Sequence, residues 1–565
     1  MRHYRWASRL GRRQALGAGG VTLAASLLAA CGGGGTKTES PASAPATTSS
    51  GVTSAASTAG GTPKPGGTLQ YGIDNLQDVM DPHQTTRVTY ALVWHNISHH
   101  LIGIDLKTGG FSDTEATKSM EQPDPTTLVF KLWPGISWQQ TADIAARPFT
   151  AADVAFNLKR IATNEPRFPR RSQFSEIDSV STPDTGTVVV KMKQPYAPFL
   201  YYLGSGYNVL VNPDATEKFG GVIDRVSAAS GIGPFTLESL DKAAGAKLKR
   251  NTAYFQKGLP YLDAVEIIGF TDDETSLASF RTGQLHVFGL PLTAEDEIKA
   301  SVKGVQVLAT GSPGQYVGPG LSFKAQPFDD MRVRQAVSLA IDRHAMMAQA
   351  YQGKGAHLLA PAPWGLGDFA IPEAELATMP GYRKDKTADF QQARQLLSAA
   401  GLKPEDVRAQ TTVGNLSYYP PTYETVLPQL RQFGFRLDVQ VQDNTAFRNA
   451  QSKGEYVWQW NLSLVDAEPD AVLRLFNYTK ASRNYNGFSD PEVDQLIDKQ
   501  ARELDRKTRT EITREISKRL IERPNWILTA NLEARVAAQA AVRDLRVAPA
   551  GSTDARDLTR TWLEK

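Results

Sequence analysis

The sequence predicts an α/β protein built of several lobes, and three observations support this. The chain has 565 residues, which allows about three or four domains or lobes. Apolar residues are 41% and charged residues 21% of the chain, a balance typical of globular proteins with large cores. Strand-like and helix-like patterns are mixed throughout, without an internal repeat of about 20 to 50 residues. Because no run of roughly 18 apolar residues follows residue 35, a polytopic membrane protein is excluded.

Residues 1–30 are typical of an export signal. An arginine-rich start that includes Arg12 and Arg13 is followed by an apolar stretch that ends at Ala30. The stretch is too short and too rich in small residues for a stable membrane-spanning helix. The arginine pair is a feature of the twin-arginine export route, but any basic start can contain such a pair, so the sequence leaves both export routes open.

The only cysteine of the chain, Cys31, follows this signal. Leu28-Ala29-Ala30-Cys31 resembles the bacterial lipobox, which implies cleavage before Cys31 and diacylation of its sulfur. The alternative is an ordinary signal with an incidental cysteine, but the position of Cys31 at the end of the apolar stretch favours lipidation. A single cysteine excludes an intramolecular disulfide. We therefore expect an exported protein, lipid-anchored on the periplasmic or extracytoplasmic face of a membrane.

Residues 31–65 are expected to form the lipidated end and a flexible tether. They are mostly Gly, Ser, Thr, Ala and Pro with no aromatic residue, so they cannot bury enough apolar surface to become ordered. The net charge of the chain is +3, but five arginines and no acid precede Cys31. From Cys31 onward 57 basic residues face 59 acidic ones, a net charge of −2. No nucleic-acid partner is therefore expected.

The body of the chain contains recognisable strands and helices. Residues 127–132 and 187–192 combine β-branched, aromatic and alternating residues and are predicted to be strands. Helices are predicted where a capping residue precedes apolar residues spaced by about 3.6 positions. These helices begin after Thr150, Asp329-Asp330, Asp342 and Asp490; the third is expected to stop at Gly353, and a charged helix is expected from about Arg506 to before Pro524.

A series of short motifs runs in order from Gly66 to about Leu545. They are Gly66-Gly67-Thr68-Leu69, Asp81-Pro82, Phe130-Lys131-Leu132 with Phe149-Thr150-Ala151-Ala152-Asp153-Val154, Gly231-Ile232-Gly233-Pro234-Phe235, Arg250-Asn251 with Tyr254-Phe255, Gly283-Gln284-Leu285, Phe328-Asp329-Asp330-Met331-Arg332-Val333-Arg334-Gln335-Ala336, Ala340-Ile341-Asp342-Arg343, and Ala393 with Leu396-Leu397 and Ala400-Gly401. Together they resemble the extracellular solute-binding proteins of ABC importers, of the peptide-binding or family 5 type.

The resemblance implies a periplasmic-binding-protein-like type II fold with three lobes, a hinge and an interlobe ligand cleft. Lobe I would combine residues 66–108, 225–313 and 528–565, lobe II would be residues 109–224, and lobe III residues 314–527. Such lobes can close as hinged bodies around a ligand held between lobes I and III. The expected function is that of a monomeric substrate-binding subunit that delivers a peptide or similar solute to an ABC permease, without a cofactor, a metal or catalytic residues.

The chain departs from this family at the cleft loop. In peptide-binding relatives an Asp four residues before the Pro of an acidic-Pro pair takes the α-amine of the ligand. Here the pair is Glu468-Pro469, Val465 occupies that place, and Asp466 stands one residue late. Asp466 is the candidate for the amine role. The alternative is that Asp466, with Glu468 and Asp470, caps a helix beginning near Ala471.

Further ligand candidates lie on residues 456–464, which alternate strictly between an aromatic and aliphatic face and a polar face. A core position is favoured for the tryptophans of this segment, although Trp460 is kept as a ligand candidate. The polar face is expected to point to the cleft, where Gln459 and Asn461 could orient a ligand. Tyr485 and Asn486 precede Gly487, in a turn that resembles one of the family, and are weaker candidates.

A metal-binding protein and an enzyme are the alternatives to a solute-binding protein. His95 and His99 stand four residues apart with His100 beside them, but no Cys or acid lies in that stretch, so a packing role is favoured. Ser239-Leu240-Asp241-Lys242 and Lys107-Thr108-Gly109 match S-x-x-K and K-T-G motifs, in the wrong order and without S-D-N. A secreted lipid-anchored hydrolase acting on peptide or glycan stays the alternative, since glycosidase carboxylates need not be neighbours. The ligand is open among peptide, sugar, opine and metal chelate.

Overall fold

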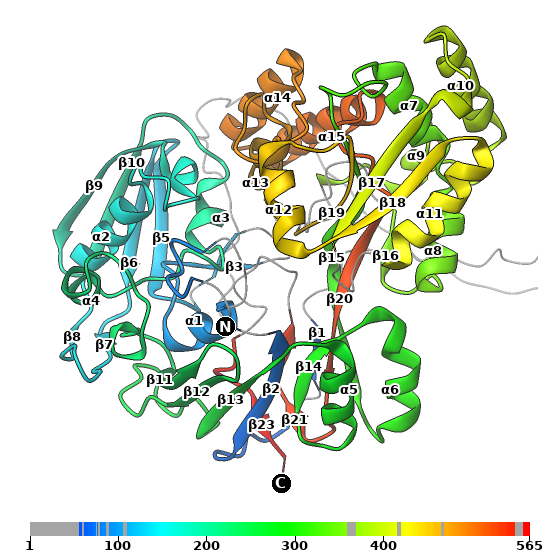
Figure 1. Cartoon of the computed structure of the whole chain (residues 1–565). Helices are drawn as coiled ribbons and strands as arrows, with labels where there is room; N and C mark the ends of the chain where they lie inside the picture. The colour runs from blue at the N-terminus through cyan, green and yellow to red at the C-terminus, as the bar shows by residue number, and fades with distance from the viewer. Residues whose placement is uncertain are drawn as a thin grey trace, which may run out of the picture. The chain divides into compact units, whose positions relative to one another are not determined.

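The computed structural model describes residues 56–58, 61–74, 76, 79–85, 90–105, 110–112, 114–358, 369–414, 420–464, 468–547 and 557–564 (Figure 1). The predicted signal, Cys31 and most of the predicted tether lie outside these residues, as does Asp466. The described end of the tether is ordered, contrary to the expectation, because β1 (Ala56–Ser57) pairs with β22 (Arg546–Val547) and the buried Thr58 exchanges hydrogen bonds with Leu545. In the part of the chain that is described, no helix combines the length and the apolar character needed to cross a membrane.

Eleven strands of the described chain form one mixed sheet. Its order is β11-β12-β13-β2-β14-β20-β15-β19-β17-β18, and β16 pairs with β20. The strands are β2 (Thr68–Asp74), β11 (Phe235–Asp241), β12 (Gly245–Arg250), β13 (Ala264–Phe270), β14 (Val287–Leu290), β15 (Gln306–Leu321), β16 (Ala356–His357), β17 (Arg408–Gly414), β18 (Arg436–Gln442), β19 (Trp458–Leu464) and β20 (Ala530–Ala538).

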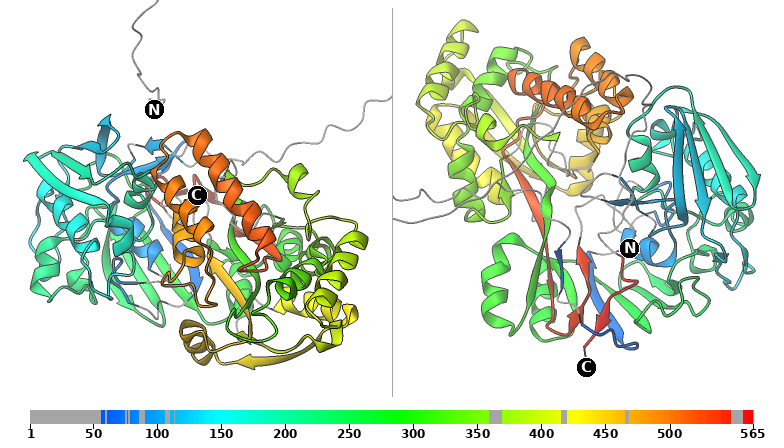
Figure 2. Two further views of the ribbon diagram at one scale, coloured as in Figure 1. Left: turned by 90° about the horizontal axis from the view of Figure 1, so that it is seen from above. Right: turned by 180° about the vertical axis from the view of Figure 1, so that it is seen from behind.

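Two strands in the middle of this sheet, β15 and β20, connect its two halves. They run antiparallel and side by side, as Figure 1 and the right view of Figure 2 show. One end of β20 pairs with β14, and β15 pairs with β19 from Gln315 to Leu321. Register shifts interrupt the pairing between Ala309 and Gln315. The backbone between the two halves is therefore a two-stranded ribbon with an irregular centre.

A second sheet has the order β5-β6-β10-β9 and packs with helix α2 (Ala151–Ile161). The predicted strands are confirmed as β6 (Thr127–Leu132) and β10 (Thr187–Met192), which pair with each other. The start of α2 is confirmed as well, because Thr150 and Asp153 form a capping box. The flanking strands are β5 (Thr117–Asp124) and β9 (Ile177–Asp184).

The remaining helix starts are confirmed, and each is capped by an aspartate that accepts backbone N–H groups. These helices are α7 (Met331–Leu339), α8 (Arg343–Tyr351), α14 (Pro491–Arg502) and α15 (Arg506–Glu522). Helix α8 ends two residues before Gly353, because Gln352 already takes the left-handed conformation with φ 53°. The other helices are α1 (Ala91–Ile97), α3 (Phe199–Leu203), α4 (Pro213–Lys218), α5 (Asp273–Arg281), α6 (Glu295–Ser301), α9 (Glu373–Leu376), α10 (Thr387–Ala399), α11 (Pro420–Phe433), α12 (Asn444–Lys453) and α13 (Pro469–Val472).

The remaining strands of the described chain are short. They pair as β1 (Ala56–Ser57) with β22 (Arg546–Val547), β3 (Gly103–Asp105) with β4 (Gly110–Ser112), β7 (Ser137–Trp138) with β8 (Arg147–Pro148), and β21 (Val542–Arg543) with β23 (Trp562–Leu563).

The hydrophobic core consists of several clusters that join segments far apart in the sequence. One cluster combines side chains from 69–97, 209–308 and 538–563. A second combines 317–460 with 527–532. A third joins side chains from 101–232 to side chains from 369–370 and 471–528. These groupings support discontinuous lobes, while the predicted residue boundaries of the lobes stay a prediction.

Two buried arginines hold the segment that leads into β20. Arg334 of α7 donates to the carbonyl oxygens of Leu321 at 2.8 Å, Pro524 at 2.8 and 3.0 Å and Asn525 at 2.8 Å. Arg343, at the start of α8, donates to the carbonyl oxygen of Leu528 at 2.7 Å. Burial lowers the pKa of Arg334 to about 9, which leaves it charged at neutral pH. The arginine-containing motif of α7 and α8 therefore fixes the chain at the point where it enters the connecting ribbon.

A buried carboxylate, Asp81, ties the first segment of the chain to α2. It accepts hydrogen bonds from both terminal nitrogens of Arg160, at 2.5 and 3.1 Å, and from the backbone N–H groups of His83 and Ile223. His83 accepts from Arg160 through Nδ1 and donates to the Val209 carbonyl through Nε2. Burial and the adjacent Arg160 hold the pKa of His83 well below its usual value, so the ring is neutral and fits these roles.

We expect Asp81→Asn to lower the free energy of unfolding by about 3–5 kcal/mol, because it leaves the buried Arg160 guanidinium without a compensating charge. Urea denaturation followed by circular dichroism measures this. The control is Asp224→Asn, which removes an exposed ion pair with Arg225 and should cost about 0–1 kcal/mol. Equal stability of the two variants would contradict the anchoring role of Asp81.

Candidate functional site

The tryptophans of β19 are core residues, as the alternation favoured. Trp458 and Trp460 are fully buried in the same cluster as residues of α7, α8 and α11. The Trp458 ring packs edge-on against Phe328, with ring centroids 5.5 Å apart. The side chain of Trp460 is thus placed for packing, and its candidacy as a ligand residue stays a prediction.

We expected the polar face of β19 to point to the ligand cleft, but the side chain of Gln459 on this face is not exposed. Gln459 is fully buried, and its Nε2 donates to the carbonyl oxygen of Phe447 in α12 at 3.2 Å. The sequence did not show that α12 covers this part of the strand. A turn joins the helix to the strand, and no sequence pattern predicts how this turn directs the helix. The side chain of Asn461 lies outside the described residues, as does Asp466, so the ligand roles of all three stay predictions.

The turn with Tyr485 and Asn486 supports the chain around it. Gly487 has φ 82°, which confirms the predicted need for glycine at this turn. Asn486 is fully buried, and its amide donates to the backbone carbonyl of Asn525 at 2.9 Å and to the side-chain oxygen of Asn525. Tyr485 is half-buried. Asn486 therefore holds the segment before β20, and a contact of either residue with ligand stays a prediction.

The three histidines near α1 pack in the interior, as favoured. His99 bonds through Nδ1 to Glu115 at 2.8 Å and through Nε2 to the Tyr254 hydroxyl at 2.9 Å, and His95 bonds to the Gly206 carbonyl at 2.9 Å. Burial raises the pKa of Glu115, but His99 and His100 outweigh it and hold the pKa well below its usual value. Within the described ranges no group of three or more His, Cys, Asp or Glu side chains is arranged to hold a metal ion.

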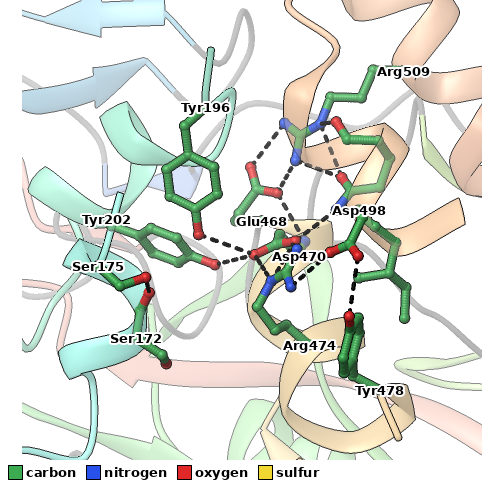
Figure 3. A network of polar contacts seen from close by, with 12 residues as sticks. Ser172, Ser175, Tyr196, Tyr202, Glu468, Asp470, Arg474, Tyr478, Asp498 and Arg509 are labelled. Carbon is green, nitrogen blue, oxygen red and sulfur yellow. Dashed lines mark hydrogen bonds and ion pairs between the residues drawn. The ribbon is translucent and has the colours of Figure 1, made fainter. Parts of the chain in front are cut away.

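The structure brings together a polar network that sequence reasoning missed (Figure 3). Its centre is the fully buried Asp470 of α13. The carboxylate accepts from the hydroxyl of Tyr202 at 3.0 Å, the hydroxyl of Tyr196 at 3.4 Å, Gln500 Nε2 at 2.7 Å and Arg474 Nε at 3.1 Å. Asp470 therefore receives donors from two parts of the chain that lie more than 260 residues apart in sequence.

Capping of a helix was the alternative role expected for Asp466, Glu468 and Asp470. In the structure, Glu468 has this role. Its carboxylate accepts from the backbone N–H of Asp470 at 2.9 Å and caps α13, which begins at Pro469 rather than near Ala471. It also pairs with the buried Arg509 of α15. The acidic-Pro pair noticed in the sequence is therefore part of a buried charge network.

The network joins the predicted lobes II and III. Tyr196 and Tyr202 belong to the segment that ends in α3, whereas Asp470 lies in the segment predicted as lobe III. Burial and the Asp470 charge hold the pKa of Tyr196 well above its usual value, so its hydroxyl stays protonated and can donate. A backbone bond from Ala197 N to the Ala501 carbonyl at 2.8 Å runs alongside. These contacts hold the two segments together.

A small cleft adjoins this network. It has a volume of about 210 Å³ and is lined by both segments, with Ser172, Ser175, Glu176, Gln194, Tyr196, Arg474, Asp498, Ala501 and Arg502 on its walls. Sites for drug-sized ligands measure about 300–1,000 Å³. The cleft is therefore too small to enclose a peptide, and the network is better understood as a contact between lobes.

We expect Tyr202→Phe to loosen this contact, because a buried carboxylate loses a donor and hydrogen bonds to charged groups contribute about 1.5–3 kcal/mol. Small-angle scattering should show a larger radius of gyration, and the melting temperature should fall. The matched control is Tyr478→Phe, whose hydroxyl donates to Asp498 at 3.1 Å within one segment. It should leave the radius of gyration unchanged. If the two variants scatter alike, the network does not hold the segments together.

Comparison with known proteins agrees with this architecture. Residues 115–484 match the family described as bacterial extracellular solute-binding proteins, family 5 Middle. The glutathione-binding protein GsiB of Salmonella typhi is 25% identical over 461 residues, which is 79% of this chain and 86% of that protein.

Solved structures show the same type II binding-protein fold. The periplasmic binding protein DppA from Helicobacter pylori, solved with the peptide STSA, aligns with a TM-score of 0.75 at 19% identity, covering 89% of this chain and 99% of that chain. NikZ from Campylobacter jejuni, solved with Ni(L-His), aligns with a TM-score of 0.72 at 17% identity, covering 86% and 97%. Because the family match spans well over half of the sequence, the chain belongs to the bacterial extracellular solute-binding proteins of family 5.

Proposed function

We propose that this chain captures a peptide or peptide-like solute in the cleft between its lobes and delivers it to the permease of an ABC importer. The observation that carries this is the membership of a solute-binding family together with two sheet halves joined by β15 and β20. Two lobes connected by a narrow ribbon can rotate about it and enclose a solute. Closure removes water from the solute, and the closed form is the one the permease receives.

The peptide class is supported by the relatives. A relative at 25% identity is a glutathione-binding protein, and a structural neighbour was solved with a peptide. Both of those ligands carry a free α-amine. Asp466 is our candidate for this amine, because a carboxylate in a water-poor cleft needs a charged partner and an ammonium group supplies one.

The anchor is part of the same proposal. Lipid on Cys31 and a tether that ends before β1, which pairs with β22, would keep the binding domain near the membrane that holds the permease, while the domain itself moves in water. The solute is then released where the permease can take it up. A monomer suffices for this role.

The alternative of a lipid-anchored hydrolase gains no support. Ser239 and Lys242 lie at the hairpin between β11 and β12, where Asp241 accepts backbone N–H groups of the turn and Lys242 is exposed. The match to an S-x-x-K motif is thus explained by a turn. The Lys107-Thr108-Gly109 match lies outside the described residues.

We expect the purified full chain to bind glutathione and the tetrapeptide Ser-Thr-Ser-Ala in titration calorimetry. Asp466→Asn should weaken the binding of the free-amine peptide by about 30-fold or more, since one partner of a buried charge pair is lost. It should not change the affinity for the N-acetylated tetrapeptide. Asp438→Asn, at an exposed position of β18, is the control.

Two results would count against these assignments. Wild-type binding of sugars but of neither peptide would refute the peptide class. Equal effects of Asp466→Asn on the free and the acetylated peptide would remove the amine role from Asp466 and leave the class intact.

We expect Cys31→Ala to abolish the lipid anchor, so that the chain either retains its leader or is found in the soluble fraction. Detergent phase partitioning of cell extracts measures this, with Ser26→Ala in the leader as the control. A Cys31→Ala chain that partitions into detergent as the wild type does, with its leader removed, would show that the anchor lies elsewhere.

A further inference from the structure

Strand β20 carries a buried amide that the fold does not use. Asn531 is fully buried, and neither its Nδ2 nor its Oδ1 has a hydrogen-bond partner among the residues that the structure describes. Its neighbours Ala530 and Leu532 belong to the hydrophobic cluster that includes Trp458 and Trp460. Because side chains alternate along a strand, Asn531 lies on the opposite face of the sheet from this cluster.

The position of Asn531 in the sheet connects it to the cleft loop. The register places Asn531 of β20 opposite Tyr316 of β15, and Tyr316 opposite Ser463 of β19. These three positions form one row across adjacent strands. Ser463 is the second-last position of β19, and the segment that contains Asp466 follows the last residue, Leu464. The amide therefore lies one row before the last row of β19, which pairs Leu464 with Gln315 and Leu532; after Leu464 the chain leaves for the proposed solute loop.

The charged groups that follow Asn531 on the same face are paired with each other. Arg535 contacts Glu533 at 2.7 Å and Glu295 at 3.3 Å. Both Glu533 and Glu295 are largely buried. Asn531 thus stands next to charged groups that contact each other, although Arg535 Nε and Glu295 Oε2 form no hydrogen bond within the described ranges. Among the described residues the amide of Asn531 has no partner for its donors or its acceptor oxygen.

A buried amide without partners is costly, since it has given up its bonds to water. Asparagine is also a poor strand former, so neither packing nor local preference explains it at this position. The group that matches a carboxamide best is another amide, because each offers one donor and one acceptor to the other. Peptide groups are the abundant source of such amides in solutes.

We propose that the side chain of Asn531 binds a peptide group of the solute, donating from Nδ2 to its carbonyl oxygen and accepting its N–H at Oδ1. This role rests on the proposed function as a peptide-binding protein. It adds recognition of the uncharged backbone of the solute to the recognition of its amine at Asp466. Solutes that lack an amide would leave Asn531 unpaired.

The inference is tested with Asn531→Leu, which keeps the branching of the side chain and removes its polar atoms. In the full chain without added solute, this variant should melt at a higher temperature than the wild type, because an unsatisfied buried amide is gone. Its affinity for glutathione and for Ser-Thr-Ser-Ala, measured by calorimetry, should be about 10- to 100-fold weaker. The two effects have opposite signs, as expected for a residue kept for binding rather than stability.

The matched control is Asn157→Leu in α2. Asn157 is equally buried, but its amide donates to the carbonyl oxygens of Asp153 and Val211 and accepts from the Val211 N–H, at 2.8, 3.0 and 2.9 Å. This variant should melt at a lower temperature and keep the wild-type affinity. If Asn531→Leu does not fold, Asn531→Ala provides the same comparison without added volume.

The outcomes distinguish the binding role of Asn531 from the proposed peptide class of the solute. A lower melting temperature of Asn531→Leu with unchanged affinity would overturn the binding role and make Asn531 a structural residue like Asn157. A wild-type chain that binds neither peptide would overturn the peptide class and the role of Asn531 with it.

Discussion

The pairing of β15 with β20 is the interaction on which the rest of the molecule depends. These strands belong to both halves of the large sheet, since β20 pairs with β14 at one end and β15 pairs with β19 at the other. Their position is fixed by Arg334 and Arg343, which reach from α7 and α8 to carbonyl oxygens before β20. A buried guanidinium can be satisfied by several carbonyl dipoles at once, because it presents five N–H donors in a fixed plane. The arginines thus tie the chain on the α7 and α8 side of the ribbon to its surroundings, whereas the pairing of the two strands is irregular near Pro313.

A hinge alone does not hold two lobes together. The network around Asp470 supplies a further contact, because it joins the segment of Tyr196 and Tyr202 to the segment of Asp470. A carboxylate without solvent needs several donors, and Asp470 obtains them from Tyr196 and Tyr202 as well as from its own segment. Separation of the segments would remove the tyrosine donors and would also expose the hydrophobic cluster that residues 101–232 share with residues 471–528. A solute can shift the equilibrium between two such arrangements only by its difference in affinity for them.

Local features of the fold could be predicted from the sequence, whereas contacts between distant segments could not. The strands 127–132 and 187–192 were predicted to the residue, and the capping residues Thr150 and Asp490 were identified, because alternation and capping are written in neighbouring positions. The pairs Asp81–Arg160 and Asp470–Tyr202 join residues 79 and 268 positions apart. Nothing in the local pattern of either residue shows which partner the fold brings to it. The burial of Gln459 was missed for the same reason, since the helix that covers it is placed by tertiary packing.

The identity of the solute is decided by few groups, and the fold leaves it open. The same fold occurs in proteins solved with a peptide and with nickel and histidine. A tenfold preference for one solute corresponds to about 1.4 kcal/mol, which one hydrogen bond to a desolvated group can provide. In the roles proposed for them, Asn531 and Asp466 would therefore suffice to favour a peptide. Asn531 would bind an uncharged amide, and a solute without an amide would leave the hydrogen bonds of Asn531 unformed. Asp466 would bind a positively charged amine. Because the amide is part of the connecting strand itself, binding of a peptide group there would act directly on the ribbon about which the lobes close.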